Sequence, residues 1–498
     1  MGVIQRQGIK HSIVNFTGLI LGTASTIFIY SQRETIEAYG LVQYLLSVGI
    51  IGYPLFALSG QTVAVRFFPH FQNKSKGHHG LLPLLILMSL AGWGISTVIA
   101  ALFWTPVSAA LASGSPLLQQ YLWMAMPIAL FYTLAVVLST YCVNFKRIVI
   151  PSILIDFSLK LFLPLQMIAL WQGWISLPLA LWLLLLHYFL MMIGMVVYLH
   201  QLGEWQWKPQ WSFLTPELRG EIGRYAGFGV ITGFALLLAT KADTLMVGTL
   251  ATIKGAGIYA IALNIAAAVE IPGKSLYSAS ASFVARYLAD ENWTEMKILY
   301  RKVSINLLAA GLLLFGCIWV SADQLYEFMP NSAEVSQGKF VLLFLCVAKL
   351  VDMGSGLNNQ LVYYSKFYRY SIYSLSVLAA ANISFNLWLI PAMGLTGAAI
   401  ATLLSVTCYN LFNLFLVWRK FRIHPFTRQT PVVVALSLLA LATVWFLPSS
   451  GSNLPDIAIR SGSYALLFAF LVLRFRISPD VNQLWSDLLN RIKTGRGA

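Results

Sequence analysis

The sequence predicts an all-α polytopic membrane protein with about fourteen transmembrane helices. Of the 498 residues, 58% are hydrophobic and only 10% are charged. A soluble globular chain is nearer to half apolar and about one quarter charged. The apolar residues gather in windows of about twenty residues, which is the length that a helix needs to cross a bilayer. Because lipid offers no partner for free backbone groups, these spans are expected to be helices.

The spans follow from the apolar windows taken in chain order. They are predicted at residues 11–31, 39–65, 81–103, 117–143, 149–170, 175–200, 222–250, 256–284, 303–321, 338–363, 369–390, 394–418, 429–447 and 459–475. The segments between them are too short to form a separate enzyme domain. The sequence therefore predicts a protein that is not an enzyme.

The loops test this order of spans, because cytoplasmic loops of membrane proteins carry an excess of Lys and Arg. With the N-terminus in the cytoplasm, the outer segments hold only Arg33, Lys254, Lys339 and Arg460. Four of the other basic residues lie within spans. All the remaining ones fall in inner segments, the last of them being Arg496. If one helix had been missed, every later loop would change sides and the basic residues would no longer gather on one side. The sequence therefore predicts an even number of spans and two cytoplasmic termini.

The composition argues against several functional classes. The net charge of +15 is explained by basic residues that face the cytoplasmic leaflet, so no nucleic-acid partner is predicted. The cysteines are Cys142, Cys317, Cys346 and Cys408. Each lies in an apolar run on a different predicted helix, so neither a disulfide framework nor a metal site is expected. There is no glycine-rich phosphate loop, so no cofactor and no ATP hydrolysis within this chain are predicted.

Three segments outside the spans carry further expectations. His78 and His79 sit in a polar loop and are expected to be solvated. The Trp-rich segment 203–221 is a natural linker between two halves of the chain. Residues 287–302 have helical apolar spacing, which predicts a separate helix on the membrane surface.

Spans one to six and seven to twelve resemble two copies of one unit. Tyr39 and Tyr259 lie near the starts of corresponding spans, and Arg66 and Arg286 close them, each pair about 220 residues apart. Because six is even, the repeat is parallel, and transporters built in this way place the substrate between the halves. The predicted domains are a bundle at 1–205, a linker at 206–221, a bundle at 222–424, and two helices with a cytoplasmic tail at 425–498.

Charged residues inside the spans are the candidate functional residues. A charge at the centre of a membrane helix costs roughly 2.5–3.5 kcal/mol, so each is expected to face protein or water. The candidates are Lys160, Lys241, Lys274 and Lys349 for substrate binding, and Asp156, Asp243, Glu270 and Asp352 for cation coupling. Four lysines against four acids leave no excess of positive charge, which weakens a purely cationic cavity.

The spacing of these charges separates two groups. Asp156 with Lys160, Glu270 with Lys274, and Lys349 with Asp352 share helix faces and can pair within one helix. Lys241 and Asp243 are two residues apart and point to opposite sides, so at least one needs a partner on another helix or faces the cavity. For every pair, a structural ion pair stays an alternative to a functional role.

Two prolines fall within the predicted spans. Pro272 lies between Glu270 and Lys274, and Pro54 has a similar place in the matching second span. Proline removes a backbone donor and kinks a helix, so each is either a bending point or a packing kink.

Three segments of the chain carry residues that match the pattern of one known family. In the segment 382–420 the matching residues are Asn382, Asn386, Ile390, Pro391, Gly394, the run Gly397–Thr402, and Ser405. In the segment 242–286 they are Asp243, Gly257, Ile258, Tyr259 and the run Ser278–Phe283. Near the N-terminus they are Gly8, Gly18, Gly22, Tyr39 and Gly40. Together these segments resemble the polysaccharide-exporter branch of the multidrug/oligosaccharidyl-lipid/polysaccharide superfamily, and the resemblance covers nearly the whole chain.

The resemblance implies two pseudo-symmetric six-helix bundles around a central cavity, working by alternating access. It implies a flippase for a polyprenyl-pyrophosphate-linked oligosaccharide in the bacterial inner membrane, with membrane lipids, Na⁺ or H⁺, and a polysaccharide polymerase as candidate partners. Spans thirteen and fourteen are either a groove for the polyprenyl tail or an accessory pair packed on the bundle. A cation-coupled multidrug extruder of the same superfamily is an alternative. An integral membrane glycosyltransferase or polymerase is an alternative of another class.

Overall fold

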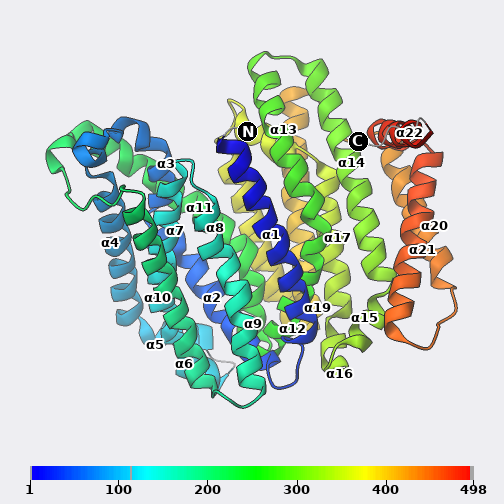
Figure 1. Ribbon diagram of the computed structural model, residues 1–498, viewed down its shortest axis with the longest axis horizontal. Helices are drawn as coiled ribbons and strands as arrows, with labels where there is room; N and C mark the ends of the chain where they lie inside the picture. Colours follow the sequence, from blue (N-terminus) through cyan, green and yellow to red (C-terminus); the bar gives the residue numbers. More distant parts are fainter. Residues whose placement is uncertain (1–2, 113–114, 494–498) are drawn as a thin grey trace. The chain divides into compact units, whose positions relative to one another are not determined.

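The computed structural model describes residues 3–112 and 115–493, and within these ranges every regular element is a helix. This confirms the all-helical class (Figure 1). The chain forms two compact units, residues 1–261 and residues 262–498. The predicted cytoplasmic tail runs past Lys493, and Arg496 lies outside the described residues.

The first unit is built from twelve numbered helices, the last of which continues into the second unit. They are α1 (Val3–Phe28), α2 (Ile36–Phe56), α3 (Gly60–Phe71), α4 (Leu81–Leu102), α5 (Trp104–Ala112), α6 (Pro116–Tyr121), α7 (Ala125–Val143), α8 (Val149–Ser152), α9 (Ser158–Trp171), α10 (Leu177–Gln201), α11 (Pro216–Leu250) and α12 (Ile253–Ala266). A π-helical turn, η3 (Ile153–Phe157), joins α8 to α9.

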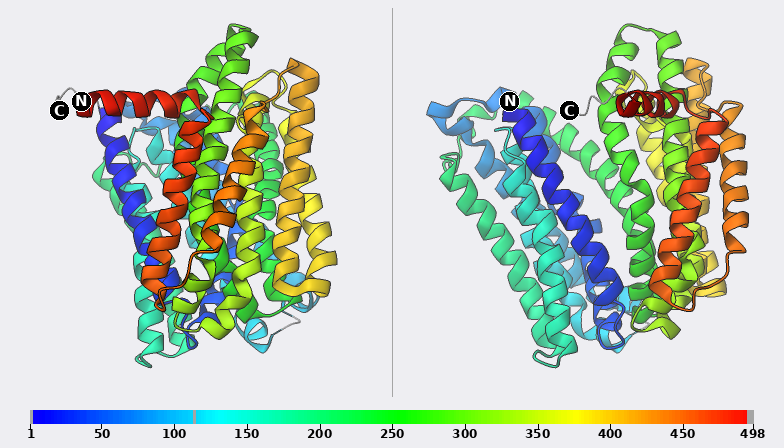
Figure 2. Two further views of the ribbon diagram at one scale, coloured as in Figure 1. Left: turned by 90° about the vertical axis from the view of Figure 1, so that its right-hand side faces the viewer. Right: turned by 45° about the vertical axis from the view of Figure 1, so that its right-hand side comes forward.

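The second unit follows through a 3₁₀ turn, η5 (Ala267–Glu270). Its helices are α13 (Ile271–Ala289), α14 (Trp293–Val320), α15 (Ala322–Phe328), α16 (Ser332–Val335), α17 (Lys339–Ser355), α18 (Asn358–Tyr364), α19 (Tyr370–Phe421), α20 (Gln429–Trp445), α21 (Asn453–Arg474) and α22 (Pro479–Lys493). In this unit α22 runs across the end of α21 (Figure 2).

The helices coincide with the predicted spans. Among the described residues, ten helical segments are long and apolar enough to cross a membrane, and the bent pair formed by α17 and α18 is an eleventh. Two shorter apolar helices, Ile13–Phe28 and Gln429–Trp445, match the first and thirteenth predicted spans. Gly394, with φ 58° and ψ −132°, divides α19 at the place where the sequence separates two spans. The total of fourteen stays a prediction, since length and composition do not locate a bilayer.

Two expectations about loops are wrong. Residues 287–302 do not form a separate surface helix, because α13 ends at Ala289 and α14 begins at Trp293. The side chain of Asn292 accepts a hydrogen bond from the backbone N–H of Glu295, which caps the start of α14. The residues after Asn292 are therefore the first turns of a long helix that continues into the span.

His78 is buried rather than solvated, with 4% of its surface exposed. Its Nε2 atom lies 2.9 Å from a carboxylate oxygen of Glu204, which is also buried. The neighbouring His79 ring stacks on Phe213 with 4.1 Å between the ring centroids. The loop after the second predicted span is thus anchored to the Trp-rich segment, so part of that segment packs within the first unit.

Helices α20 and α21 pack on α14 in the second unit. The Tyr464 hydroxyl donates to the backbone oxygen of Leu312 at 3.0 Å and lies 2.8 Å from Ser437 Oγ. Ser461 Oγ donates to the backbone oxygen of Cys317 at 2.8 Å. These contacts favour an accessory pair packed on the bundle. The predicted groove for a polyprenyl tail stays a prediction.

The first unit contains a crossing of α2 and α12 that only glycine allows. A Cβ atom added at Gly40 would lie 2.1 Å from the backbone oxygen of Ile253. One added at Gly257 would lie 2.3 Å from the backbone oxygen of Ile36. Small residues permit such close approach in membrane proteins, where packing rather than water exclusion holds helices together. Tyr39 and Tyr259, which mark the suspected repeat, are both fully buried beside this crossing.

We expect Gly257→Ala to destabilise the protein, because its Cβ would meet backbone that cannot move aside. The matched control is Gly94→Ala in α4, where no atom lies within 4 Å of the added Cβ. Alanine there should be neutral or should stabilise by up to about 1 kcal/mol through its higher helix propensity. Thermal unfolding in mild detergent would measure both variants. Equal melting temperatures would contradict the backbone contact.

Candidate functional site

The polar groups of the second unit gather where a span is broken. Helix α17 ends at Ser355, α18 begins at Asn358, and the two are bent by 54°. Gly356 between them has φ 63° and ψ −127°, a conformation that side-chain-bearing residues rarely adopt. A Cβ on Gly356 would also lie 2.9 Å from Cβ of Ser304 on α14. Broken helices at membrane depth occur in transporters where the chain lines a binding site or a cavity.

Side chains on both sides of the break are joined by one amide. Asn358 Nδ2 donates to Asn410 Oδ1 at 2.9 Å, and Asn410 Nδ2 donates to Asp352 Oδ1 at 3.1 Å. Ser304 Oγ donates to the backbone oxygen of Gly354 at 2.6 Å, which satisfies a carbonyl next to the break. We call Asp352, Asn358 and Asn410 the bridge. It fixes the bend and leaves a carboxylate held by an amide rather than by a cation.

A second contact brings two distant candidates together. Lys349 Nζ lies 2.5 Å from Glu270 Oε2. Lys349 is on α17, one turn before Asp352, and Glu270 is the last residue of η5. The two side chains are 32% and 27% exposed, so this ion pair is only partly shielded from its surroundings.

The three expected pairs within single helices are not formed among the described residues. Glu270 pairs with Lys349 instead of Lys274. Glu270 is the N-cap residue of α13, and its side chain contacts α17 rather than the next turn of its own helix. Lys349 is therefore not the partner of Asp352. Asp156 accepts a hydrogen bond from Ser152 Oγ at 3.1 Å.

The remaining lysines of the candidate set have no acidic partner in their own unit, within the residues that the structure describes. Lys274 is exposed on α13, and Lys160 is exposed on α9. The Lys160 side chain runs toward Gly18, where its Cδ atom would lie 3.2 Å from an added Cβ. Lys241 is partly buried on α11, whereas Asp243 is 6% exposed. The opposite orientation expected for these last two residues stays a prediction.

The two prolines lie next to irregular backbone. Pro272 follows η5 and is in the first turn of α13, so the helix type changes just before it. Pro54 is buried in α2, which ends two residues later at Phe56. The residues that separate α2 from α3 include Leu58 and Ser59, both with positive φ. A role of either proline in bending during transport stays a prediction.

Sequence reasoning missed the amides. Asn358 and Asn410 were not among the candidate residues, although each is an uncharged polar residue within a predicted apolar span. Asn382 and Asn386 were noted only for the resemblance, and the structure shows both buried, with Asn386 Nδ2 donating to Asn382 Oδ1 at 3.1 Å. A search for Asn at membrane depth, beside the search for charges, would have found all four.

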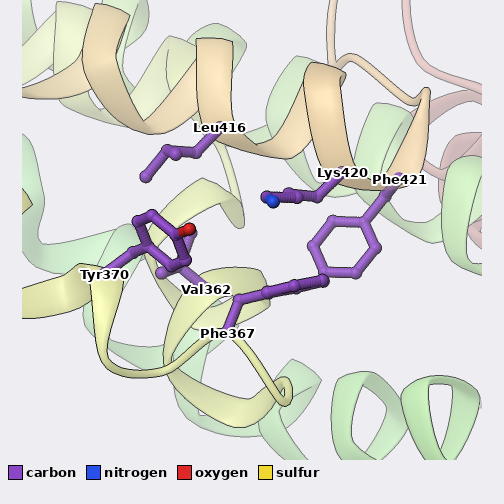
Figure 3. Close-up of a pocket in the computed structure, with 6 residues that line it drawn as sticks. All are labelled: Val362, Phe367, Tyr370, Leu416, Lys420 and Phe421. Carbon is purple, nitrogen blue, oxygen red and sulfur yellow. The ribbon is translucent and has the colours of Figure 1, made fainter.

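A small pocket lies at the end of α19 that the loop charges predict to be cytoplasmic. Its lining residues are Val362, Phe367, Tyr370, Leu416, Lys420 and Phe421 (Figure 3). Lys420 Nζ lies 4.9 Å from the centroid of the Phe367 ring and 5.4 Å from that of Tyr370. The rings thus hold the ammonium group by cation–π contacts. In the described part of the chain, no group of three or more His, Cys, Asp or Glu is placed to hold a metal ion.

Comparisons with known proteins agree with this architecture. Residues 230–357 match the MatE family. A probable flippase, AglR of Haloferax volcanii, is 27% identical over 203 residues, which are 39% of this chain. The match spans 42% of the length of that relative.

Two solved structures share the fold. The lipid II flippase MurJ, in an inward closed conformation, has a TM-score of 0.71 and 14% identity, over 94% of this chain and 98% of that one. An inward-facing multidrug resistance transporter of the MATE family, in the MOP superfamily, has a TM-score of 0.55 and 12% identity, over 82% and 94%. At these identities the similarity concerns the fold.

We expect Glu270→Gln and Lys349→Met to be coupled. Each single change leaves one charge without its partner, and should cost about 1–3 kcal/mol of unfolding free energy, less than for a fully buried pair because both groups are partly exposed. The double variant removes both charges and should cost less than the sum of the two single changes. Denaturation in mild detergent gives the four values of the cycle. Additive losses would show that the two side chains do not interact.

Proposed function

We propose that this chain, a member of the multidrug/oligosaccharidyl-lipid/polysaccharide transporter superfamily, is a flippase for a polyprenyl-pyrophosphate-linked oligosaccharide. It would carry the repeat unit of a surface polysaccharide across the bacterial cytoplasmic membrane. The observation that carries the proposal is that two lysines in predicted spans have no partner in their own units, within the residues that the structure describes. Among the described residues of their own units, neither Lys241 nor Lys274 forms an ion pair or a hydrogen bond, although both lie in helices long enough to span a membrane.

The chemistry of these lysines suits a pyrophosphate. An ammonium group at membrane depth is costly to keep and marks a ligand or ion path in most membrane proteins. Lysine acts as a point charge toward phosphate oxygens, which spread their own charge over several atoms. Lys349 is less suited to this task because Glu270 already neutralises it. The name of the curated relative, a probable flippase, supports the same class of function.

The carboxylates provide a means of coupling export to a gradient of Na⁺ or H⁺. Asp352 accepts only an amide hydrogen bond in the bridge, so its carboxylate has no salt bridge to give up before binding a cation. Glu270 would have to release Lys349 first. This difference favours Asp352 over Glu270 as the residue that takes up the ion, with Asp243 and Asp156 as further candidates in the first unit.

A multidrug extruder is the second candidate function, and it is favoured by the match of residues 230–357 to the MatE family. A site for organic cations would be expected to have acidic groups without basic partners. In the second unit Asp352 meets this expectation, whereas Lys274 is a basic group without an acidic partner and suits an anionic substrate. A membrane glycosyltransferase or polymerase is less suited, because the predicted outer segments near 104–116 and 322–337 are short.

We expect Lys241→Ala and Lys274→Ala each to lower surface polysaccharide several-fold at matched protein level, because each removes a contact to the anionic headgroup. The matched control is Lys297→Ala, which changes an exposed lysine near the start of α14 that has no ion pair among the described residues. Export is measured as polysaccharide at the cell surface. Normal export from both variants would rule out their role in substrate binding.

Deletion of the gene should cause a lipid-linked oligosaccharide to accumulate on the inner leaflet. The multidrug alternative instead predicts normal polysaccharide and greater sensitivity to organic cations. Analysis of extracted lipids, together with growth in the presence of such cations, separates the two functions.

A further inference from the structure

The last described helix of the second unit differs in direction from the helix before it. Helix α21 is long and apolar enough to cross a membrane, and it ends at Arg474. Helix α22 begins at Pro479 and runs across the end of α21 instead of continuing along its axis (Figure 2). The loop charges predict that this end of α21 is cytoplasmic. Helix α22 therefore begins at the level where a bilayer around α21 would meet the cytoplasm.

The start of α22 is fixed to α14. Asp480 accepts a hydrogen bond from Asn306 Nδ2 at 2.8 Å, and its other carboxylate oxygen lies 2.6 Å from Lys302 Nζ. Ser478 Oγ donates to Asn306 Oδ1 at 2.5 Å and accepts from the backbone N–H of Val481 at 3.3 Å. These contacts hold the first turn of α22, so its direction is set by packing on α14 as well as by the preceding turn.

The sequence of α22 has an apolar side and a polar side. With about 3.6 residues per turn, its apolar residues fall on one side of an α-helix and its polar residues on the other. The apolar residues are Val481, Leu484, Trp485, Leu488, Leu489 and Ile492. A short helix with this division and little overall hydrophobicity is typical of helices that lie in the plane of a membrane surface.

The protein leaves this apolar side uncovered where its side chains are described. Val481 and Trp485, one turn apart, are 36% and 48% exposed. An uncovered apolar face marks a site of contact with a membrane or with another protein. Tryptophan is common at the boundary between membrane and water, where its ring meets both apolar and polar groups.

Basic residues flank α22 at both ends of its sequence. Arg474 and Arg476 precede it and are exposed, and Arg491 and Lys493 belong to its last turn. The segment 474–493 holds four basic residues against two acids. Basic residues next to a membrane are attracted by the anionic lipids of the cytoplasmic leaflet. The charge, together with the place of α22 at the end of a span, favours a lipid surface over a soluble protein as the partner.

We propose that α22 binds the anionic lipid surface of the membrane that α21 crosses. Its apolar side would insert among the lipid headgroups, and the flanking basic residues would contact lipid phosphates. The contact of Asp480 with α14 joins this lipid-binding helix to the second unit. The residues proposed above for the substrate and for the coupled ion take no part, so this inference does not rest on the proposed function.

Spin labels on the full-length protein test the lipid contact. The native cysteines are replaced by alanine, and a nitroxide is attached to one introduced cysteine at a time. Val481→Cys and Trp485→Cys place the label on the apolar side of α22. The matched controls are Gln483→Cys and Asp487→Cys on the polar side, where both side chains are exposed as well. Thermal unfolding checks that each labelled protein is folded.

The labels are compared in vesicles of phosphatidylcholine mixed with phosphatidylglycerol. Collisions with oxygen, which concentrates in lipid, are divided by collisions with a water-soluble nickel chelate. Because an apolar face inserts about 5–10 Å into the headgroup boundary, this ratio should be about fivefold or more higher at 481 and 485 than at 483 and 487. In pure phosphatidylcholine the difference should fall about twofold or more, as it should for the double variant Arg474→Gln and Arg476→Gln in mixed vesicles.

Three outcomes would overturn the proposal. The first is an equal ratio at all four positions in the mixed vesicles. The second is a difference that stays unchanged in pure phosphatidylcholine and in the arginine variant, because the surface would then not be recognised by its charge. The third is a difference that appears in native membranes but not in vesicles, because the apolar side would then bind a protein of those membranes.

Discussion

Polar groups inside a membrane must find partners within the protein, and the second unit is organised around this constraint. The break between α17 and α18 frees backbone groups and places Asp352 next to them. Asn410 on α19 forms hydrogen bonds with side chains on both sides of the break. Ser304 on α14 donates a hydrogen bond to the backbone oxygen of Gly354 next to it. None of these helices could shift along its neighbour without leaving a buried polar group unsatisfied, at a cost of about 1–3 kcal/mol for each. The bend at Gly356 is therefore a fixed feature of the fold.

The sequence was sufficient for properties that depend on one segment at a time. Apolar windows located the helices, and Gly394 marked the boundary between two spans that the structure divides at the same residue. It was insufficient where two segments meet. Helical spacing suggested that Glu270 pairs with Lys274, but the partner of Glu270 is Lys349, which lies 79 residues further along the chain. His78 was expected in solvent because nothing in its own loop reveals Glu204, 126 residues further on.

The described residues of both units include buried polar atoms without a hydrogen-bond partner, for example the hydroxyl groups of Tyr53 and Tyr300, but the carboxylates of the two units differ in where their partners come from. In the second unit the carboxylates of Glu270 and Asp352 have partners from other helices. In the first unit Tyr53 has none for its hydroxyl group, and Asp156 is held only by a serine one turn away. The hydrogen bonds of the bridge thus come from a different helix and hold α17, α18 and α19 together.

The number of lysines and acids in the predicted spans does not by itself tell whether an anion can bind, because it matters which of these charges are paired. Counted from the sequence, four lysines and four acids cancel, which argues against binding of an anion. In the structure Glu270 neutralises Lys349, and amides rather than lysines hold Asp352. Lys160, Lys241 and Lys274 are left without acidic partners among the described residues of their units. An anionic headgroup interacts with the charges that are free, not with their sum. A chain that is neutral by count can therefore still attract a pyrophosphate.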